Sequence, residues 1–434
     1  GILSHLKFDE NAGNTALDIV NNENLKVEYV FNDAEFKPST DPLWRKGVVD
    51  NALLFDGYST YVKQSVKKSA QPSDAITIEA WVAPRSYEWG DLGQLSAIVN
   101  QHNKARGEGF ILGMGRHGKW SFQAGLNGEW KEVWAREDKV LEKDQWSYIV
   151  ATFDQDTKKM KLFLNGELAG EVDTPQNATI TASETDLLIG KHNTAAVISA
   201  FTANMFNGMI DELKIYNKAL SDEEIKTNYS QVIDSFENSQ LPSPDLSFDR
   251  SVYDGDRYRP QYHFLSPGHW MNEPHAPFYY NGKYHIFYQH NPQGPYWHQI
   301  HWGHAVSDDM VHWEDAPVAL APSGVSPDGV WSGSATFDKN GDPALFFTAG
   351  DDSKTPNQMT GLAKPVDVTD PMLKKWEMLE KPVTIQQPDL PAEEGKVMYG
   401  QFRDPFVWQD GDTWYQIVGS GIENVGGSAL LYKS

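Results

Sequence analysis

The chain has 434 residues and a formal net charge of −23, from 37 Lys and Arg against 60 Asp and Glu. That length fits two or three folded domains, a hydrophobic content of 40% excludes a mainly disordered chain, and the negative charge argues against nucleic acid as a partner. The chain has no cysteine, which excludes disulfides and thiolate chemistry, and no apolar run as long as a membrane span.

Residues 1–230 carry short strands separated by turn residues. Segments 76–82 and 159–164 have strand composition, and the second runs through Asn165-Gly166 into 167–172, a sequence typical of a tight hairpin. Many strands at such spacing predict a β-sandwich. Ser221 with Glu224 forms a capping-box pattern that predicts a short terminal helix over 221–229.

Residues 231–258 are polar and contain prolines, which predicts an ordered but irregular linker. Beyond it, a repeat begins. Turns at Asn281, Asn340 and Asp410 each separate two apolar strands, and they recur at intervals of 59 and 70 residues. This period predicts propeller blades of four short strands. The third copy stops after its third strand, 428–434, so about two and three-quarter blades are expected, too few to close a propeller.

Polar residues gather in aromatic surroundings where each predicted blade begins. The motifs are Trp-Met-Asn-Glu-Pro-His at 270–275, Trp-Ser-Gly-Ser at 331–334 and Gln-Phe-Arg-Asp-Pro at 401–405. Because the first strands of blades line a central channel, we expect Glu273 and Asp404 to converge on one axial pocket. Two such carboxylates suit acid/base or nucleophilic work on a glycosidic bond.

Simpler interpretations stand beside this one. Most acidic residues of any chain are solvated surface, and Gln289 could only cap the end of an apolar strand. Four tryptophans, Trp270, Trp297, Trp302 and Trp331, could be core residues rather than platforms for a sugar. His298, His301 and His304 lie in a strand-like region without a fixed carboxylate nearby, so no metal site is predicted there.

With these motifs in order, residues 259–434 resemble glycoside hydrolase family 32, the invertase, inulinase and levanase family. The resemblance implies part of a five-bladed propeller. The family's first motif reads Trp-Met-Asn-Asp-Pro with Asp as nucleophile, so Glu273 stands at the nucleophile position. Asp404 is implied to bind fructose hydroxyls and stabilise the transition state. The implied substrate-binding residues are Asn272, Gln289, Trp297, Trp331, Ser332 and Arg403.

The resemblance implies a retaining β-fructosidase that hydrolyses levan, inulin or sucrose-type oligosaccharides through a fructosyl-enzyme intermediate. A fructosyltransferase on the same scaffold and a non-catalytic fructan-binding protein are the alternatives. The extra methylene of Glu273 moves its carboxylate by roughly 1 Å, a shift that can lower a rate about a hundredfold. We expect the site to have adjusted, with His275 in place of the family's usual Asn, rather than to have lost hydrolysis.

The mechanism also needs a proton donor. In the resembling family it is a Glu well beyond the Arg-Asp-Pro motif, and only 30 residues follow Asp404 here. The nearer acid, Glu423, is interpreted as a turn residue. We therefore expect this chain alone to lack the acid/base, and a further C-terminal part of the enzyme, separate or missing, to supply it and to cover the strand edge near Leu430.

Residues 1–230 resemble a laminin G-like or concanavalin A-like jelly roll, through the segments 52–57, 77–82, 163–166 and 208–216. This resemblance leaves a carbohydrate-binding role and a structural spacer open. No cofactor is expected, and a structural calcium ion in this domain stays an open alternative. The expected fold is thus all-β, a jelly-roll sandwich followed by the first part of a propeller, in a bacterial protein that is extracellular, cell-surface or periplasmic.

Overall fold

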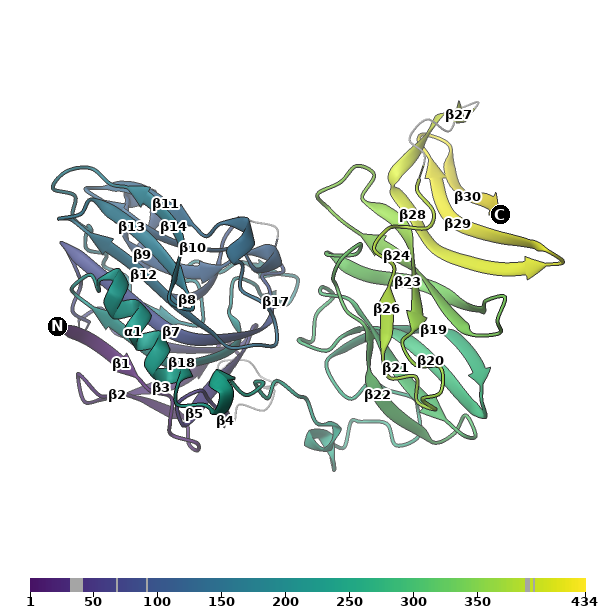
Figure 1. The fold of residues 1–434 in the computed structure, drawn as a ribbon, viewed down its shortest axis with the longest axis horizontal. Helices are drawn as coiled ribbons and strands as arrows, with labels where there is room; N and C mark the ends of the chain where they lie inside the picture. Colours follow the sequence, from purple (N-terminus) through teal and green to yellow (C-terminus); the bar gives the residue numbers. More distant parts are fainter. Residues whose placement is uncertain (32–41, 68, 91–92, 387–390, 393–394) are drawn as a thin grey trace. The chain divides into compact units, whose positions relative to one another are not determined.

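A computed structural model gives the fold of the chain and describes residues 1–31, 42–67, 69–90, 93–386, 391–392 and 395–434. The described residues are nearly all in strands, turns and loops, as predicted (Figure 1). They form two compact units, Gly1–Ser247 and Phe248–Ser434, and the division falls within the predicted linker. No helix in these described ranges is long and apolar enough to cross a membrane.

The first unit is a sandwich of antiparallel strands. Its hydrogen-bonded order is β11-β10-β9-β8-β15-β6-β3-β2-β1-β18-β7-β12-β13-β14, with β5 beside β18 and β4 beside β5. The strands are β1 (Ile2–Leu6), β2 (Thr15–Asp18), β3 (Glu23–Tyr29), β4 (Leu43–Lys46), β5 (Asn51–Asp56), β6 (Thr60–Gln64), β7 (Ala75–Ser86), β8 (Ser96–Asn103), β9 (Glu108–Met114), β10 (Trp120–Leu126), β11 (Glu129–Trp134), β12 (Ser147–Asp154), β13 (Lys159–Leu164), β14 (Glu167–Asp173), β15 (Leu187–Ile189), β16 (Val197–Ile198), β17 (Phe201–Thr202) and β18 (Asn207–Tyr216).

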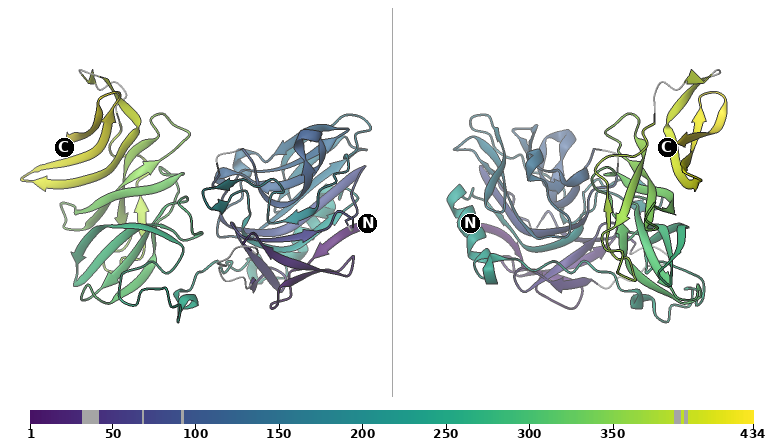
Figure 2. Two further views of the ribbon diagram at one scale, coloured as in Figure 1. Left: turned by 180° about the vertical axis from the view of Figure 1, so that it is seen from behind. Right: turned by 45° about the vertical axis from the view of Figure 1, so that its right-hand side comes forward.

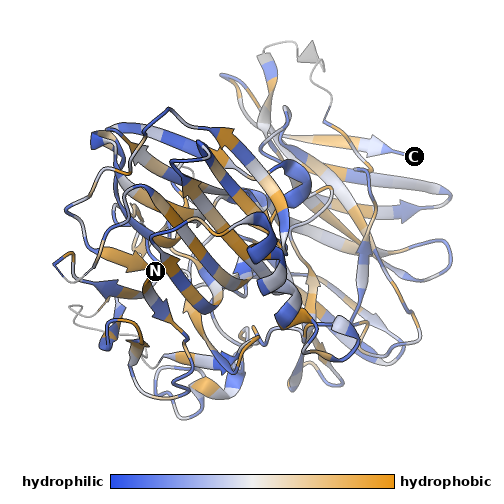
Figure 3. Cartoon of the chain, turned by 60° about the vertical axis from the view of Figure 1, so that its left-hand side comes forward, coloured by the Kyte–Doolittle hydropathy of each residue, from blue (hydrophilic) through white to orange (hydrophobic). Residues whose placement is uncertain are grey.

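Hydrophobic and hydrophilic residues alternate along these strands, so that one face of the sheet lines the core and the other faces outward, as the hydropathy colours show (Figure 3). Ile78 on β7 and Phe153 on β12 face inward from one half of the sheet. Phe110 on β9 and Phe122 on β10 meet them from the other half. The core therefore lies between the two halves, and every second residue of β9, β10 and β11 is left for the outer face.

The β13–β14 hairpin confirms the Asn-Gly prediction. β13 has the predicted bounds, and Asn165 and Gly166 have φ values of 51° and 82°. A two-residue turn of this type needs positive φ at both central positions, which Asn and Gly tolerate best. The local sequence therefore fixes the turn, and a register shift between Leu162 and Phe163 changes the pairing further along the two strands.

Helix α1 (Asp222–Ile233) begins at the predicted capping box. The Ser221 hydroxyl accepts a hydrogen bond from the Glu224 backbone N–H, and the Glu224 carboxylate accepts one from the Ser221 N–H. The predicted end at residue 229 was wrong, because Val232 and Ile233 continue the apolar spacing of Ile225 and pack on the outer cluster beside β7 and β12.

The second unit consists of three four-stranded antiparallel sheets that follow one another along the chain (Figure 2). The first two run in simple order from inner to outer strand. The strands are β19 (Trp270–Tyr280), β20 (Lys283–Asn291), β21 (His301–Ser307), β22 (Trp313–Leu320), β23 (Gly329–Phe337), β24 (Pro343–Gly350), β25 (Gln358–Pro365), β26 (Trp376–Met378), β27 (Pro391–Ala392), β28 (Gly395–Asp410), β29 (Thr413–Ile422) and β30 (Gly426–Lys433).

The predicted repeat is confirmed in its turns and strands. Turns at Asn281, Asn340 and Asp410 join the first two strands of one predicted copy each. Trp313 and Trp376 each begin the fourth strand of a sheet. The third sheet differs from the prediction, because the two-residue strand β27 precedes its three long strands. Strand β30, which was predicted as the third strand of its copy, lies at the edge of the sheet.

The first strands lie next to one another. β23 contacts both β19 and β28, and the first two sheets share a core that includes Phe287, Trp302 and Phe347. The three sequence motifs lie in β19, β23 and β28, where the predicted blades begin. The packing of the first strands therefore decides which motif side chains meet.

Candidate active site

Each motif coincides with an irregularity in the strand pairing. In all three sheets the strand that carries the motif shifts its register against the next strand: between Met271 and Pro274 in β19, between Trp331 and Gly333 in β23, and between Arg403 and Phe406 in β28. Glu273, Ser332 and Asp404 lie inside these shifts. A bulge turns a side chain out of the regular alternation, which allows three neighbouring strands to direct polar groups toward one place.

Three predicted residues form a hydrogen-bonded set, which we call the serine cluster. The Ser332 hydroxyl on β23 donates to the Glu273 carboxylate on β19. The Gln289 amide on β20 donates to the same hydroxyl at 2.5 Å. Gln289 is 7% exposed and lies within β20, so the prediction that it follows the strand was wrong. The serine cluster thus fixes one oxygen of Glu273.

Asp404 is joined to this cluster through the backbone. The buried Thr348 hydroxyl on β24 donates to the Ser332 carbonyl oxygen at 2.9 Å and accepts the Asp404 N–H at 2.9 Å. Sequence reasoning missed Thr348. Its only signal was a polar residue within the apolar run 344–349, and Thr is common in strands.

The charges of the site influence one another. Partial burial raises the pKa of Asp404, the Arg403 guanidinium lowers it, and the Glu273 carboxylate raises it. Arg403 is exposed and donates to the Gln401 side chain. Two carboxylates that interact in this way, one of them held by a hydroxyl donor, are groups that can attack a sugar carbon and stabilise positive charge on it.

The aromatic candidates have different surroundings. Trp302 is fully buried, and its indole N–H donates to the Trp331 carbonyl oxygen at 3.0 Å, so it is a core residue. The half-buried Trp331 indole lies over Gly329 and Gly350, where a Cβ atom would come within 2.5 Å of the ring. Trp297 is 49% exposed and packs edge-on against His298.

Among the described residues, neither Asn272 nor Trp297 has a hydrogen bond to the serine cluster. Asn272 is exposed on β19. His275, two residues beyond Glu273, packs edge-on against Trp302 with ring centroids 4.1 Å apart, and burial lowers its pKa to about 3. It is therefore a neutral side chain on the same strand as Glu273.

Two further predictions can be placed. His304 is buried and shares a hydrogen bond of 2.9 Å with His285 in the neighbouring strand. Glu423 is exposed in the turn between β29 and β30, which agrees with its interpretation as a turn residue. Neither residue belongs to the serine cluster.

One carboxylate cluster in the first unit has the geometry of a cation site. Oxygen atoms of Asp9, Asp211 and Glu212 lie within 4.8 Å of one another. One Asp211 oxygen accepts the N–H groups of Val48 and Val49, and the other is buried without a hydrogen-bond partner in the described part of the chain. Three such oxygens could hold a calcium ion, whose Ca–O distances are 2.3 to 2.6 Å.

We propose that calcium binds this cluster, so that the stability of the first unit depends on both calcium and pH. Burial raises the pKa of Asp211 to about 8, so the protonated folded state is favoured and stability is lost as pH rises from about 4 to 8. We expect the melting temperature in chelator to fall over this range, and calcium to restore it most at pH 8.

The Asp211→Asn variant should lose both dependences. Asp156→Asn, in an exposed turn, should keep them. Melting followed by calorimetry checks this, and equal melting temperatures in calcium and chelator at every pH would contradict the assignment.

Two family models match the chain. Residues 263–434 match "Glycosyl hydrolases family 32 N-terminal domain", and residues 56–226 match "Concanavalin A-like lectin/glucanases superfamily". The chain is 42% identical over 178 residues to the cell wall isozyme of β-fructofuranosidase from Zea mays, covering 41% of this chain and 29% of the relative. It is 37% identical over 186 residues to fructan 6-exohydrolase from Beta vulgaris, covering 42% and 30%.

Among solved structures, fructan 1-exohydrolase IIa from Cichorium intybus is 38% identical, covers 41% of this chain and 32% of that chain, and has a TM-score of 0.36. The chain spans about three tenths of the length of the curated relatives it matches. The second unit thus resembles part of a glycoside hydrolase. Residues 263–434 match the N-terminal domain of glycoside hydrolase family 32, and residues 56–226, earlier in the chain, match a concanavalin A-like domain.

Proposed function

We propose that the protein is a retaining β-fructosidase that releases fructose from levan, inulin or sucrose-type oligosaccharides. The observation that carries the proposal is the serine cluster, in which Glu273, Gln289 and Ser332 meet from three strands of a family 32 domain. Curated relatives of that domain are named β-fructofuranosidase and fructan exohydrolase. The cell wall isozymes among them favour an extracellular location, which we propose for this protein too.

In the proposed mechanism, a carboxylate oxygen of Glu273 attacks the anomeric carbon of the fructosyl unit as the bond to the leaving oxygen breaks. The Ser332 hydroxyl donates to this carboxylate and holds its orientation. The negative charge of Asp404 stabilises the oxocarbenium-like transition state. Water then attacks the same carbon, which frees fructose and restores the carboxylate.

The leaving oxygen must receive a proton. Glu423 is exposed in a turn and unsuited to this role, and the curated relatives are much longer than the part that matches. We propose that a further part of the enzyme supplies the acid/base. A substrate whose leaving group needs no proton, β-fructosyl fluoride, separates this step from the attack.

The deciding experiment has two parts. The protein incubated with levan, inulin or sucrose should release free fructose, and product analysis separates hydrolysis from fructosyl transfer. The 434-residue chain incubated with β-fructosyl fluoride should become labelled on Glu273, which peptide mass spectrometry detects. Calorimetric binding of fructan with neither turnover nor labelling would overturn the proposal in favour of a binding protein.

Removing the hydroxyl that joins the serine cluster should slow the reaction. A hydrogen bond to a charged group contributes about 1.5 to 3 kcal/mol, so Ser332→Ala should lower kcat/KM on sucrose by about 10- to 100-fold. Initial-rate kinetics check this. Ser353→Ala, whose hydroxyl bonds Asp351 in an exposed turn, is the control; a change in Ser332→Ala as small as that of the control would speak against the assigned contact.

A further inference from the structure

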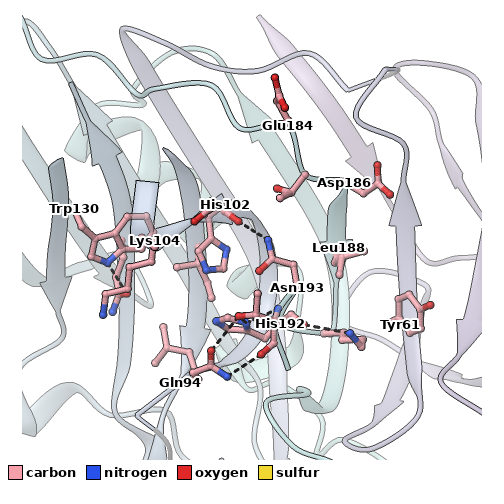
Figure 4. A pocket seen from close by; sticks show the side chains of 18 of the residues that line it. Tyr61, Gln94, His102, Lys104, Trp130, Glu184, Asp186, Leu188, His192 and Asn193 are labelled. Atoms are coloured by element: carbon pink, nitrogen blue, oxygen red, sulfur yellow. Dashed lines mark hydrogen bonds between the residues drawn. The ribbon is translucent and has the colours of Figure 1, made fainter. Parts of the chain in front are cut away.

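A cavity of about 980 Å³ lies in the first unit, on the face of the sheet that points away from the core (Figure 4). It extends over β11, β10, β9, β8, β15 and β6, which are neighbours in the sheet. Tyr61, Gln123 and Leu188 line it, while Val62 and Phe122, the next residues along two of these strands, face the core. The alternation of the strands therefore gives this sheet a second, partly polar surface.

One wall of the cavity is an indole with a fixed orientation. Trp130 is half-buried, and its ring N–H donates to the side chains of Gln123 at 3.2 Å and Glu132 at 3.1 Å. Its ring packs against the small apolar cluster that contains Ile111 and lies 5.6 Å from the His102 ring. Since the N–H is already bonded, what Trp130 offers to a ligand is its apolar surface.

Two buried polar atoms of the cavity have no hydrogen-bond partner among the described residues. They are Nδ1 of His102 and Oδ1 of Asn193. The Asn193 amide nitrogen donates to the His102 carbonyl oxygen at 2.6 Å, which fixes Oδ1 as the free acceptor. Burial lowers the pKa of His102 to about 4 and that of the adjoining His192 to about 3, so both rings are neutral at physiological pH.

The charged residues at the cavity do not favour an anion. Lys63, Lys104 and Lys191 line the cavity together with Glu184 and Asp186. Because Lys104 also lies 3.6 Å from the Glu132 carboxylate, the three positive charges are matched by three nearby carboxylates. A fully ionised anion such as sulfate has no proton to donate to Asn193 Oδ1. A ligand hydroxyl can donate to that oxygen and also accept from another group.

We propose that this cavity binds a neutral oligosaccharide. The ligand lays an apolar ring face on Trp130 and directs hydroxyls toward Asn193 and His102. The argument uses residues of the first unit alone and does not depend on the reaction proposed for the family 32 domain. It assigns the concanavalin A-like domain a ligand site of its own.

The test uses the full chain carrying Glu273→Gln, so that no substrate is consumed. Levan, inulin, mixed-linkage β-glucan and xylan are the neutral probes in affinity electrophoresis and calorimetry, and sodium phosphate is the anionic probe. We expect at least one neutral probe to bind. Trp130→Ala and Asn193→Ala should each weaken that binding at least tenfold without lowering the melting temperature of the first unit by more than a few degrees.

Trp134→Ala is the matched control. Trp134 is 43% exposed on the same strand and also donates to Glu132, at 3.1 Å, but it does not line the cavity. It should leave binding unchanged. In the chain with Glu273 restored, labelling of Glu273 by β-fructosyl fluoride separates this site from the active site, because Trp130→Ala should not alter it.

Three results would overturn the proposal. One is the absence of binding by every neutral probe. Another is that the Trp130→Ala and Asn193→Ala variants bind the sugar as strongly as the Trp134→Ala control does, which would place the sugar elsewhere. The third is displacement of the bound sugar by phosphate, which would indicate an anion site.

Discussion

The Glu273→Gln variant should hydrolyse sucrose at least about a thousandfold more slowly than the unchanged protein. Its amide oxygen can still accept the Ser332 hydroxyl, so the shape of the serine cluster is kept while the nucleophile is lost. Fructose release measures the rate. Calorimetry with levan and the melting temperature should show that binding and folding are nearly intact.

Glu423→Gln serves as the control, because Glu423 is exposed in a turn and its loss should change no rate. Near-normal turnover in Glu273→Gln would overturn the assignment of the nucleophile. Glu273→Asp is informative in either direction: a faster variant would mean that the site still fits the shorter side chain of the wider family.

The Asp404→Asn variant should lose about two to three orders of magnitude in kcat/KM, by removing a charge that stabilises the transition state. The backbone at Asp404 has φ of 62°, in the left-handed region that Asn tolerates well. The hydrogen bond to Thr348 uses the backbone N–H and survives the change. Asn therefore removes the charge with little change of structure.

Asp410→Asn, in the turn that ends the same strand, is the matched control for loss of an acid from β28. The pH profile offers a second measurement. Because partial burial raises the pKa of Asp404, activity that needs its ionised form should fall, on acidification, at a pH above the usual range of an aspartate. A loss below tenfold and an unshifted acid limb would contradict this role.

The sequence predicted this structure best where the determining interaction lies between residues that are neighbours in the chain. Asn165-Gly166 fixes a turn by its own backbone preferences, and β13 has the predicted bounds. Ser221 and Glu224 fixed the start of α1, but its end depends on Val232 and Ile233 packing against the sheet. A capping box can be recognised from residues close together in the sequence, whereas the packing of the helix end against the sheet cannot.

The same distinction applies to the site. The repeat phase predicted that Glu273 and Asp404 would converge on one pocket, whereas the contact of Glu273 with Ser332, 59 residues further along, was not predicted. It could not predict the bulges that turn them toward each other, because a register shift depends on both paired strands. Nor could it find Thr348, whose importance arises from the packing of β28 beside β23 and β24.

The backbone link from Thr348 to Asp404 also has a consequence for the order of events during synthesis. Thr348 leaves the ribosome 56 residues before Asp404, a delay of roughly 3 to 11 s at about 5 to 20 residues per second. During that interval the inner strand β23 has β19 beside it but not β28. We therefore expect variants at the β23–β28 contact to change the yield of folded protein, and their activities should be normalised by the number of competent sites.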